Sequence, residues 1–441
     1  MPGWGDVDIA SGWLPVTVDA LAIAALLLAV VRRTSRRGAL VLAACAVGGA
    51  AAGLLVCWIT SDLLDVFEVS LSPVSRTWVA STFAAVALAI GMLMRHGVWR
   101  RVAAAASVPL AILAGAIGVN ADFGQYTTID SFWDAAAARP LPASIAAAQR
   151  ADAPGSVVSD AAPVPLWSRP VAAGMPRHGV VGRVDIPATT SHFPARAGYV
   201  YLPPAALVPH PPRLPVLVML SGQPGGPDDV IRAGRLAAIM NARAAAHHGL
   251  APVVVVPDQL GAPQDNPMCV DSPLGDSARY LTVDVPRWIR THLAVEPSRA
   301  AWAIGGFSQG GTCSIQLGAA HPELFGAVFD VSGQVAPRNG DLQQTIARGF
   351  DGDAARYRAA APAAILAAHA PYRGLTAVFG SGQFDTRYGP GIDVVAAAAR
   401  AAGVATTRDI APGTAHDWHT VQWMMTHAFG PIAAHLGLAR S

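Results

Sequence analysis

Charged residues are scarce in this sequence, and lysine is missing altogether. Only 14% of the 441 residues are charged and the net charge is +2, whereas 52% are hydrophobic. Binding of a nucleic acid needs a concentrated basic face, so this balance argues against such a partner. All 31 basic residues are arginine. Together with the abundant alanine, this indicates a compositional bias, and alanine runs are therefore weak evidence for helices.

Cysteine is also rare, with four in the chain. Cys45 and Cys57 lie in an apolar stretch, where we expect them to be packing residues. Cys269 and Cys313 lie in the later part of the chain. If that part is outside the cytoplasm, we expect a disulfide between them; the alternative is two separate buried thiols.

Long hydrophobic runs are plentiful by contrast, and four of them fill the first 120 residues. Each is long enough to cross the hydrocarbon core of a bilayer: Leu14–Val31, Gly38–Ile59, Thr77–Met94 and Val102–Val119. Acidic residues precede the first run and basic residues follow it, which is the reverse of a signal peptide. We predict a four-span, all-α transmembrane domain over residues 1–120.

The arginines predict how these spans are oriented. Between spans one and two, and between spans three and four, the loops carry Arg32, Arg33, Arg36, Arg37, Arg95, Arg100 and Arg101. The loop between spans two and three is acidic instead, with Asp62, Asp65 and Glu68. Because positive loops stay in the cytoplasm, we expect everything after Asn120 to lie outside the cell membrane, with the lipid bilayer as a partner.

The rest of the chain divides into a linker and a folded domain. Residues 121–178 are expected to form an extracytoplasmic linker, because they become rich in Ala, Pro, Ser and Gly and lose any apolar period. Over residues 179–441, runs rich in valine and isoleucine alternate with helical patterns, which predicts an α/β fold with a mostly parallel sheet flanked by helices. Strands are expected at 180–186, 199–202, 216–220, 253–257, 301–304, 327–331, 375–380 and 406–410, and helices at 228–248, 277–293, 391–402 and 417–436.

One stretch carries a serine in the setting that nucleophilic chemistry requires. The apolar run Ala301–Ile304 is short enough for a buried strand. The pentapeptide Gly306-Phe307-Ser308-Gln309-Gly310 follows it and leads into a helical pattern. Strand, sharp turn and helix make a nucleophile elbow, whose flanking glycines avoid collisions with the neighbouring strand and helix. Ser308 is therefore the predicted nucleophile.

A serine hydroxyl needs a base to activate it and a third group that orients the base. In α/β-hydrolases these follow in the order serine, acid, histidine, and reactive residues gather beyond the carboxyl ends of parallel strands. His416, in the loop after the final strand, meets both conditions as the base. Asp385, just past the 375–380 strand, is the predicted acid, and Asp330 is the alternative.

Two backbone N–H groups must also hold the oxyanion. The amide of Gln309 follows the nucleophile directly. Gln223 is the expected second donor, because it lies in the glycine-rich loop after an early strand and its neighbour Pro224 has no N–H. We expect Ser221, Gly222 and Trp418 to line the substrate site. The histidines show no spacing typical of metal ligands, so we predict neither a metal nor an organic cofactor.

These motifs resemble the "Putative esterase" family of α/β-hydrolases, which includes esterase D-like enzymes and cell-envelope mycolyltransferases. The likeness covers residues 180–437, and it is carried by Leu220–Gln223, Tyr280–Trp288, Gly306–Gly310, His321–Phe325 and His416–Trp418. It implies Ser308 as nucleophile and His416 as base, with Gln223 and Gln309 as oxyanion donors.

The sequence departs from the mycolyltransferase branch of that family. Those enzymes carry a Leu-Asp-Gly-Leu-Arg motif in the oxyanion loop, whereas this chain has Ser221 at the Asp position and Pro224 at the Arg position. Their acid is a glutamate from a differently built loop, and Asp385 fits the esterase-like branch better.

The expected function is that of a membrane-anchored, extracytoplasmic serine esterase acting on a lipid or cell-envelope ester. Two alternatives stay open at this point. The acyl group could pass to an alcohol instead of water, which would make the protein an acyltransferase. The hydrolase fold could also be a catalytically silent binding domain on a transport or sensing bundle; the order Ser308, Asp385, His416 argues against that reading.

Overall fold

The chain forms two compact units in a computed structural model that describes residues 4, 7–30, 35–66, 69–93, 97–132, 139–155, 159, 165–168 and 174–440. The first, here called the bundle unit, comprises Met1–Ala135 and two later loop segments, Phe384–Thr386 and Gly413–His419. The second, here called the sheet unit, comprises Ala136–Gln383, Arg387–Pro412 and Thr420–Ser441. The predicted domain boundaries at residues 120 and 178 stay predictions.

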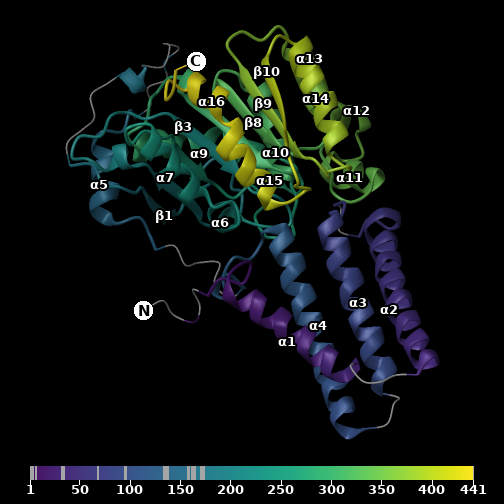
Figure 1. Ribbon diagram of the computed structural model, residues 1–441. Coiled ribbons are helices and arrows are strands. Elements are labelled where there is room, and N and C mark those ends of the chain that lie inside the picture. The colour runs from purple at the N-terminus through teal and green to yellow at the C-terminus, as the bar shows by residue number, and fades with distance from the viewer. Residues whose placement is uncertain are drawn as a thin grey trace. The chain divides into compact units, whose positions relative to one another are not determined.

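The described part of the bundle unit contains four helices long and apolar enough to cross a membrane, as the sequence predicts (Figure 1). They are α1 Trp13–Val30, α2 Arg36–Cys57, α3 Pro73–Leu93 and α4 Val98–Phe123. A π-helical turn, Trp58–Leu63, extends α2. Large apolar side chains point outward, such as Leu28, Leu40 and Val47, which are 71%, 69% and 70% exposed. So much apolar surface fits a hydrocarbon environment better than water.

Small residues let these helices approach one another closely. A Cβ placed on Gly49 of α2 would lie 2.6 Å from the backbone oxygen of Phe83 on α3, and one on Gly53 would lie 2.9 Å from the Cα of Ala80. Glycines four positions apart are typical of tightly packed membrane helices. Helix α3 contacts both α2 and α4, and α4 also contacts α1.

An eight-stranded sheet forms the centre of the sheet unit (Figure 1). Its strands are β1 Val180–Val184, β2 Gly198–Leu202, β3 Val216–Leu220, β4 Val253–Val256, β7 Trp302–Phe307, β8 Ala327–Val331, β9 Thr376–Gly382 and β10 Ala405–Ala411. The order is β1-β2-β4-β3-β7-β8-β9-β10. Strands β1, β2 and β4 pair antiparallel, and all other neighbours pair parallel. A separate two-stranded hairpin joins β5 Asp271–Ser272 and β6 Gly275–Asp276.

Helices connect and cover the strands. They are α6 Pro227–Arg232, α7 Leu236–Ala246, α8 Ser277–Arg279, α9 Val285–His292, α10 Gln309–Ala320, α11 Leu342–Gly349, α12 Ala354–Ala359, α13 Pro362–His369, α14 Gly389–Ala401, α15 Trp418–Trp423 and α16 Gly430–His435. Helix α10 contacts β7 and β8, and α14 contacts β9 and β10. The α/β fold is therefore confirmed. The single helix expected over residues 228–248 was wrong, because the chain turns at Arg235, whose φ is +49°, and splits it into α6 and α7.

One helix lies where the sequence predicts only an irregular linker. Helix α5, Ala143–Ala151, contacts α9 of the sheet unit. Its Gln149 is buried, donates to the Ala206 carbonyl at 2.8 Å and accepts the Ala294 N–H at 3.1 Å. This part of the segment is therefore anchored; residues 156–158, 160–164 and 169–173 lie outside the described part of the chain.

Parallel register brings several loops to one edge of the sheet. Phe307 at the end of β7 pairs with Val331 of β8, Val331 pairs with Gly380 of β9, and Gly382 pairs with Ala411 at the end of β10. The loops that leave these strands therefore start at a common edge, which is where α/β proteins place their ligands.

A disulfide joins Cys269 to Cys313 in the first turns of α10, with Cα atoms 5.5 Å apart, as the sequence reasoning expects. Cys45 and Cys57 are free. The two bonded cysteines are 44 residues apart in sequence. Cross-linking a loop of this size removes conformational freedom from the unfolded chain.

We predict that Cys269→Ala lowers the free energy of unfolding of the oxidised protein by about 4 kcal/mol, the size expected for such a loop. Denaturant unfolding of the purified full chain measures this loss. The double variant Cys269→Ala/Cys313→Ala should lose about the same amount, and Cys45→Ala, which removes a free thiol, serves as the matched control. Equal stability of Cys269→Ala and Cys45→Ala would contradict the prediction.

Candidate active site

Ser308 occupies the sharp turn between β7 and α10. Its φ and ψ are +56° and −116°, a backbone conformation rare for residues other than glycine. Strain of this kind concentrates at functional sites. Its N–H donates to the Val331 carbonyl at 2.8 Å, which fixes the turn to β8. The side chain therefore stands at the N-terminus of a buried helix, 8% exposed.

The glycines on either side of Ser308 are required by space. A Cβ on Gly306 would lie 2.3 Å from the backbone of Gly310, and a Cβ on Gly310 would lie 2.4 Å from the Ser221 carbonyl oxygen. Neither contact can be relieved by rotating a side chain, because the atoms met belong to the backbone. The pentapeptide thus has the form of a nucleophile elbow.

The loop after β3 passes directly beside the elbow. A Cβ placed on Gly222 would lie 3.6 Å from the Cβ of Ser308. Gln223 follows it and forms a cis peptide bond with Pro224. The loop therefore brings Gly222 close to the predicted nucleophile, and Gln309, the first residue of α10, directly follows Ser308.

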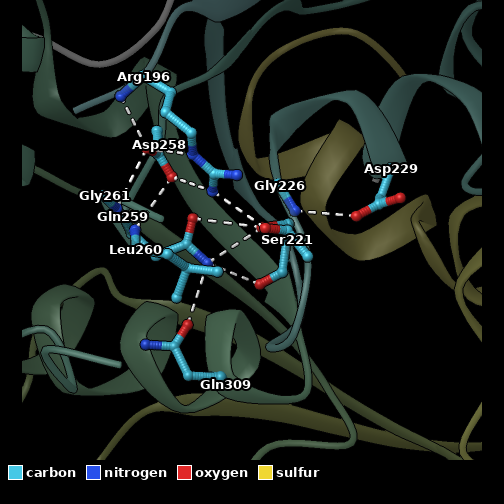
Figure 2. Close-up of polar contacts among 10 residues, drawn as sticks. Arg196, Ser221, Gly226, Asp229, Asp258, Gln259, Leu260, Gly261 and Gln309 are labelled. Atoms are coloured by element: carbon cyan, nitrogen blue, oxygen red, sulfur yellow. Dashed lines mark hydrogen bonds and ion pairs between the residues drawn. The ribbon is translucent and has the colours of Figure 1, made fainter. Parts of the chain in front are cut away.

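A buried glutamine holds this loop to α10. Figure 2 shows Gln259 between Ser221 and Gln309. Its Nε2 donates to the Ser221 carbonyl at 2.8 Å and to Oε1 of Gln309 at 3.0 Å, and Ser221 Oγ lies 3.3 Å away. Ser221 and Gln259 are fully buried. The structure thus engages the Ser221 hydroxyl within the scaffold, although the sequence analysis places it in the substrate site.

An ion pair lies beside the same network (Figure 2). Both oxygens of the buried Asp258 accept from Arg196, through Nε and Nη2 at 2.8 Å each. Arg196 Nη2 also donates to the Gly225 carbonyl at 3.0 Å. Burial lowers the pKa of Arg196, but the bond to Asp258 and nearby negative charge outweigh this and raise it. Arg196 therefore stays charged, and its bonds to Gly225 and Asp258 connect the glycine-rich loop to the segment after β4.

Sequence reasoning missed these supporting residues. Asp258 and Gln259 lie just after β4, separated from it by Pro257, at the edge where the strands end, and this position was the available signal. Arg196 gives no comparable signal, because it lies in an irregular segment between β1 and β2.

Asp385 and His416 form a buried pair. Nδ1 of His416 lies 2.9 Å from Oδ2 of Asp385, and the two residues are 5% and 3% exposed. Asp385 lies in the loop after β9 and His416 in the loop after β10. The Phe384 N–H donates to the Thr414 carbonyl at 2.8 Å, which joins the loops. A carboxylate that accepts from Nδ1–H leaves Nε2 of the neutral imidazole able to accept a proton.

The loop of His416 also bonds to the end of α4, within the bundle unit. The indole N–H of Trp418 donates to Oε1 of Gln125 at 2.7 Å. Nε2 of His419 lies 2.8 Å from the carbonyl oxygen of Ala121, one of the last carbonyls of α4, which have no partner within the helix. Trp418, expected in the substrate site, is 5% exposed.

Asp330, the alternative acid, is placed differently. It is completely buried at the end of β8, and its Oδ1 accepts the Gly333 N–H at 3.0 Å. Its Oδ2 has no hydrogen-bond partner among the described residues. Burial raises the pKa of Asp330 to about 7, against the opposing effects of the Gly333 N–H and the charge of Arg408. The carboxyl bonded to His416 is thus Asp385.

Within the described part of the chain, no group of three or more His, Cys, Asp or Glu residues could hold a metal ion.

We predict that Asp330→Asn flattens the pH dependence of stability. A carboxyl whose pKa is raised on folding stabilises the protein below its unfolded pKa, near 4, and this contribution is lost as the pH rises through about 7. The melting temperature of the variant should therefore improve relative to that of the unmodified protein between pH 4 and pH 8. Thermal unfolding across this range measures the difference; parallel curves for the two proteins would contradict it.

Comparisons with known proteins give the family. The family model described as "Putative esterase" matches residues 195–427. An uncharacterised protein of Corynebacterium glutamicum is 30% identical over 447 residues, covering 98% of this chain and 97% of the relative. Among solved structures, an S-formylglutathione hydrolase from Agrobacterium tumefaciens is 20% identical with a TM-score of 0.48, covering 60% of this chain and 96% of that one. FphF, a fluorophosphonate-binding serine hydrolase of Staphylococcus aureus, is 16% identical with a TM-score of 0.45, covering 57% and 97%. The family match spans more than half of the chain and includes the elbow, so the protein belongs to the "Putative esterase" family and is an esterase-type serine hydrolase.

Proposed function

We propose that the protein is a membrane-anchored serine esterase whose catalytic residues are Ser308, His416 and Asp385. The observation that carries this proposal is the buried bond between His416 Nδ1 and Asp385 Oδ2 at 2.9 Å, because it joins a base to its orienting acid. The loops of both residues leave the edge of the sheet at which β7 ends, directly before Ser308.

The reaction follows from these roles. His416 Nε2 takes the proton of the Ser308 hydroxyl as Oγ attacks the ester carbonyl carbon. Asp385 stabilises the resulting imidazolium. The tetrahedral intermediate collapses, the C–O bond to the alcohol breaks, and His416 gives its proton to the leaving alcohol. Water, deprotonated by the same imidazole, then attacks the acyl-enzyme and releases the acid, which regenerates the serine.

Two backbone amides hold the negative oxygen of the intermediate in this proposal. Gln309 N–H stands at the N-terminus of α10, where helix geometry leaves it without an intrahelical acceptor. The Gln223 N–H belongs to the loop after β3, in which the preceding residue, Gly222, approaches Ser308. The bonds from Gln259 to both segments keep the donors in place before the reaction begins, so no reorganisation is needed in the transition state.

The location and substrate follow from the bundle unit. Four apolar helices exceed what a tether needs, and the arginine-rich loops favour placement of residues after Asn120 outside the cytoplasmic membrane. We infer that the substrate is an ester of a lipid or of another cell-envelope component.

The nucleophile is tested with a fluorophosphonate probe on the purified full chain. We predict that the unmodified protein is labelled and that Ser308→Ala is not. Labelling of Ser308→Ala would show that another residue is the nucleophile. If the folded, unmodified protein is not labelled, the proposed serine esterase activity is refuted.

The acid is tested by the turnover of a soluble short-chain ester. Asp385→Asn should lower kcat by about 10³–10⁴-fold, the loss typical when the orienting carboxylate of a triad is replaced. Asp330→Asn is the matched control and should keep turnover within a few-fold of the unmodified protein. The reverse pattern would assign the acid to Asp330.

Product analysis with and without an added alcohol separates hydrolysis from acyl transfer, because only transfer makes a new ester.

A further inference from the structure

A groove runs along the bundle unit between α3 and α4. Its volume is about 670 Å³. The walls are mostly apolar and consist of Val79, Phe83, Ile112, Ala116, Val119 and Phe123. Gly115 forms part of its floor, where a Cβ would lie 2.0 Å from the hydroxyl oxygen of Thr82. Gly115 thus lets α3 approach α4 closely, and the groove lies along a helix pair that is apolar enough to cross a membrane.

The polar side chains in the groove bond to the protein itself. The Thr82 hydroxyl donates to the Trp78 carbonyl at 2.9 Å. Asn120 donates through Nδ2 to the Tyr126 carbonyl at 2.7 Å and accepts the Tyr126 N–H at 2.9 Å. No charged residue lines the groove in the described part of the chain. A polar ligand would lose its hydrogen bonds to water here without replacement, whereas a hydrocarbon chain would lose none.

One end of the groove lies next to Trp418, close in sequence to the proposed base. Gln125, which lines that end, accepts the indole N–H of Trp418 at 2.7 Å. Trp418 begins α15, two residues after His416 in the preceding loop. A molecule in the groove therefore has its far end among apolar helices and its near end at the start of α15, beside the segment that carries the imidazole.

We propose that this groove binds the hydrocarbon chain of the ester substrate. The inference rests on the proposed esterase function and names the substrate class as esters with a long, unbranched alkyl or acyl chain, drawn from the bilayer. The chain occupies the space between α3 and α4, and its polar ester end lies at the Gln125–Trp418 bond. The groove then acts as a binding site for the chain, and the bundle does more than anchor the enzyme.

Chain-length preference tests the groove. The full chain in detergent micelles is assayed with p-nitrophenyl butyrate and p-nitrophenyl palmitate. Ala116→Trp fills the groove with a side chain and should raise KM for the palmitate about tenfold, as expected when the contacts of two or so methylenes are lost. The kcat/KM for butyrate should change less than about twofold, because the short chain does not reach the groove.

Leu113→Trp is the matched control, since Leu113 lies on the same helix and is 47% exposed without lining the groove. It should leave both substrates unaffected. Phe83→Ala, which widens the groove, should shift the preference in favour of bulkier chains. An unchanged palmitate KM in Ala116→Trp, or an equal loss with both substrates, would overturn the proposal. Absence of butyrate hydrolysis by the unmodified protein would instead refute the esterase function, so the two failures are distinguishable.

Discussion

The geometry of the sheet unit's proposed catalytic edge depends on one crowded turn. Ser308 takes a positive φ because β7 must give way to α10 within one residue. The turn is possible only where Gly306 and Gly310 leave room for the backbone. The same crowding brings Gly222 against Ser308, and Gln259 then holds the two segments together. A strained serine, a helix N-terminus and a glycine-rich loop therefore follow from a single steric constraint.

The loops that carry Asp385 and His416 cluster with the membrane-type helices. Bonds from Trp418 to Gln125 and from His419 to Ala121 attach the base loop to the end of α4. In the proposed lipid-ester hydrolase, these bonds would keep the segment of the base beside the helices that are apolar enough to cross a membrane.

Local patterns in the sequence were enough to predict the fold. The expected strands coincide with all eight strands of the large sheet. The central strands β3 and β4 were the clearest, because a strand buried on both faces is apolar throughout. Chain order and position at strand ends singled out Asp385 and His416, which the structure joins by a hydrogen bond. Contacts between distant segments were not predictable in this way. The roles of Gln259 and Arg196 and the attachment of Trp418 to Gln125 depend on the tertiary arrangement. The turn at Arg235 differs, because Gly234 directly before it was a local signal of the break between α6 and α7.

The proposed mechanism requires the Ser308 hydroxyl to carry the acyl group of the substrate during turnover. The most direct measurement is tandem mass spectrometry of the full chain, quenched with acid during turnover of a slowly hydrolysed ester. We expect an acyl adduct on the peptide that contains Ser308, with the modified residue assigned to that serine. An adduct on any other residue, or hydrolysis without a covalent intermediate, would contradict it.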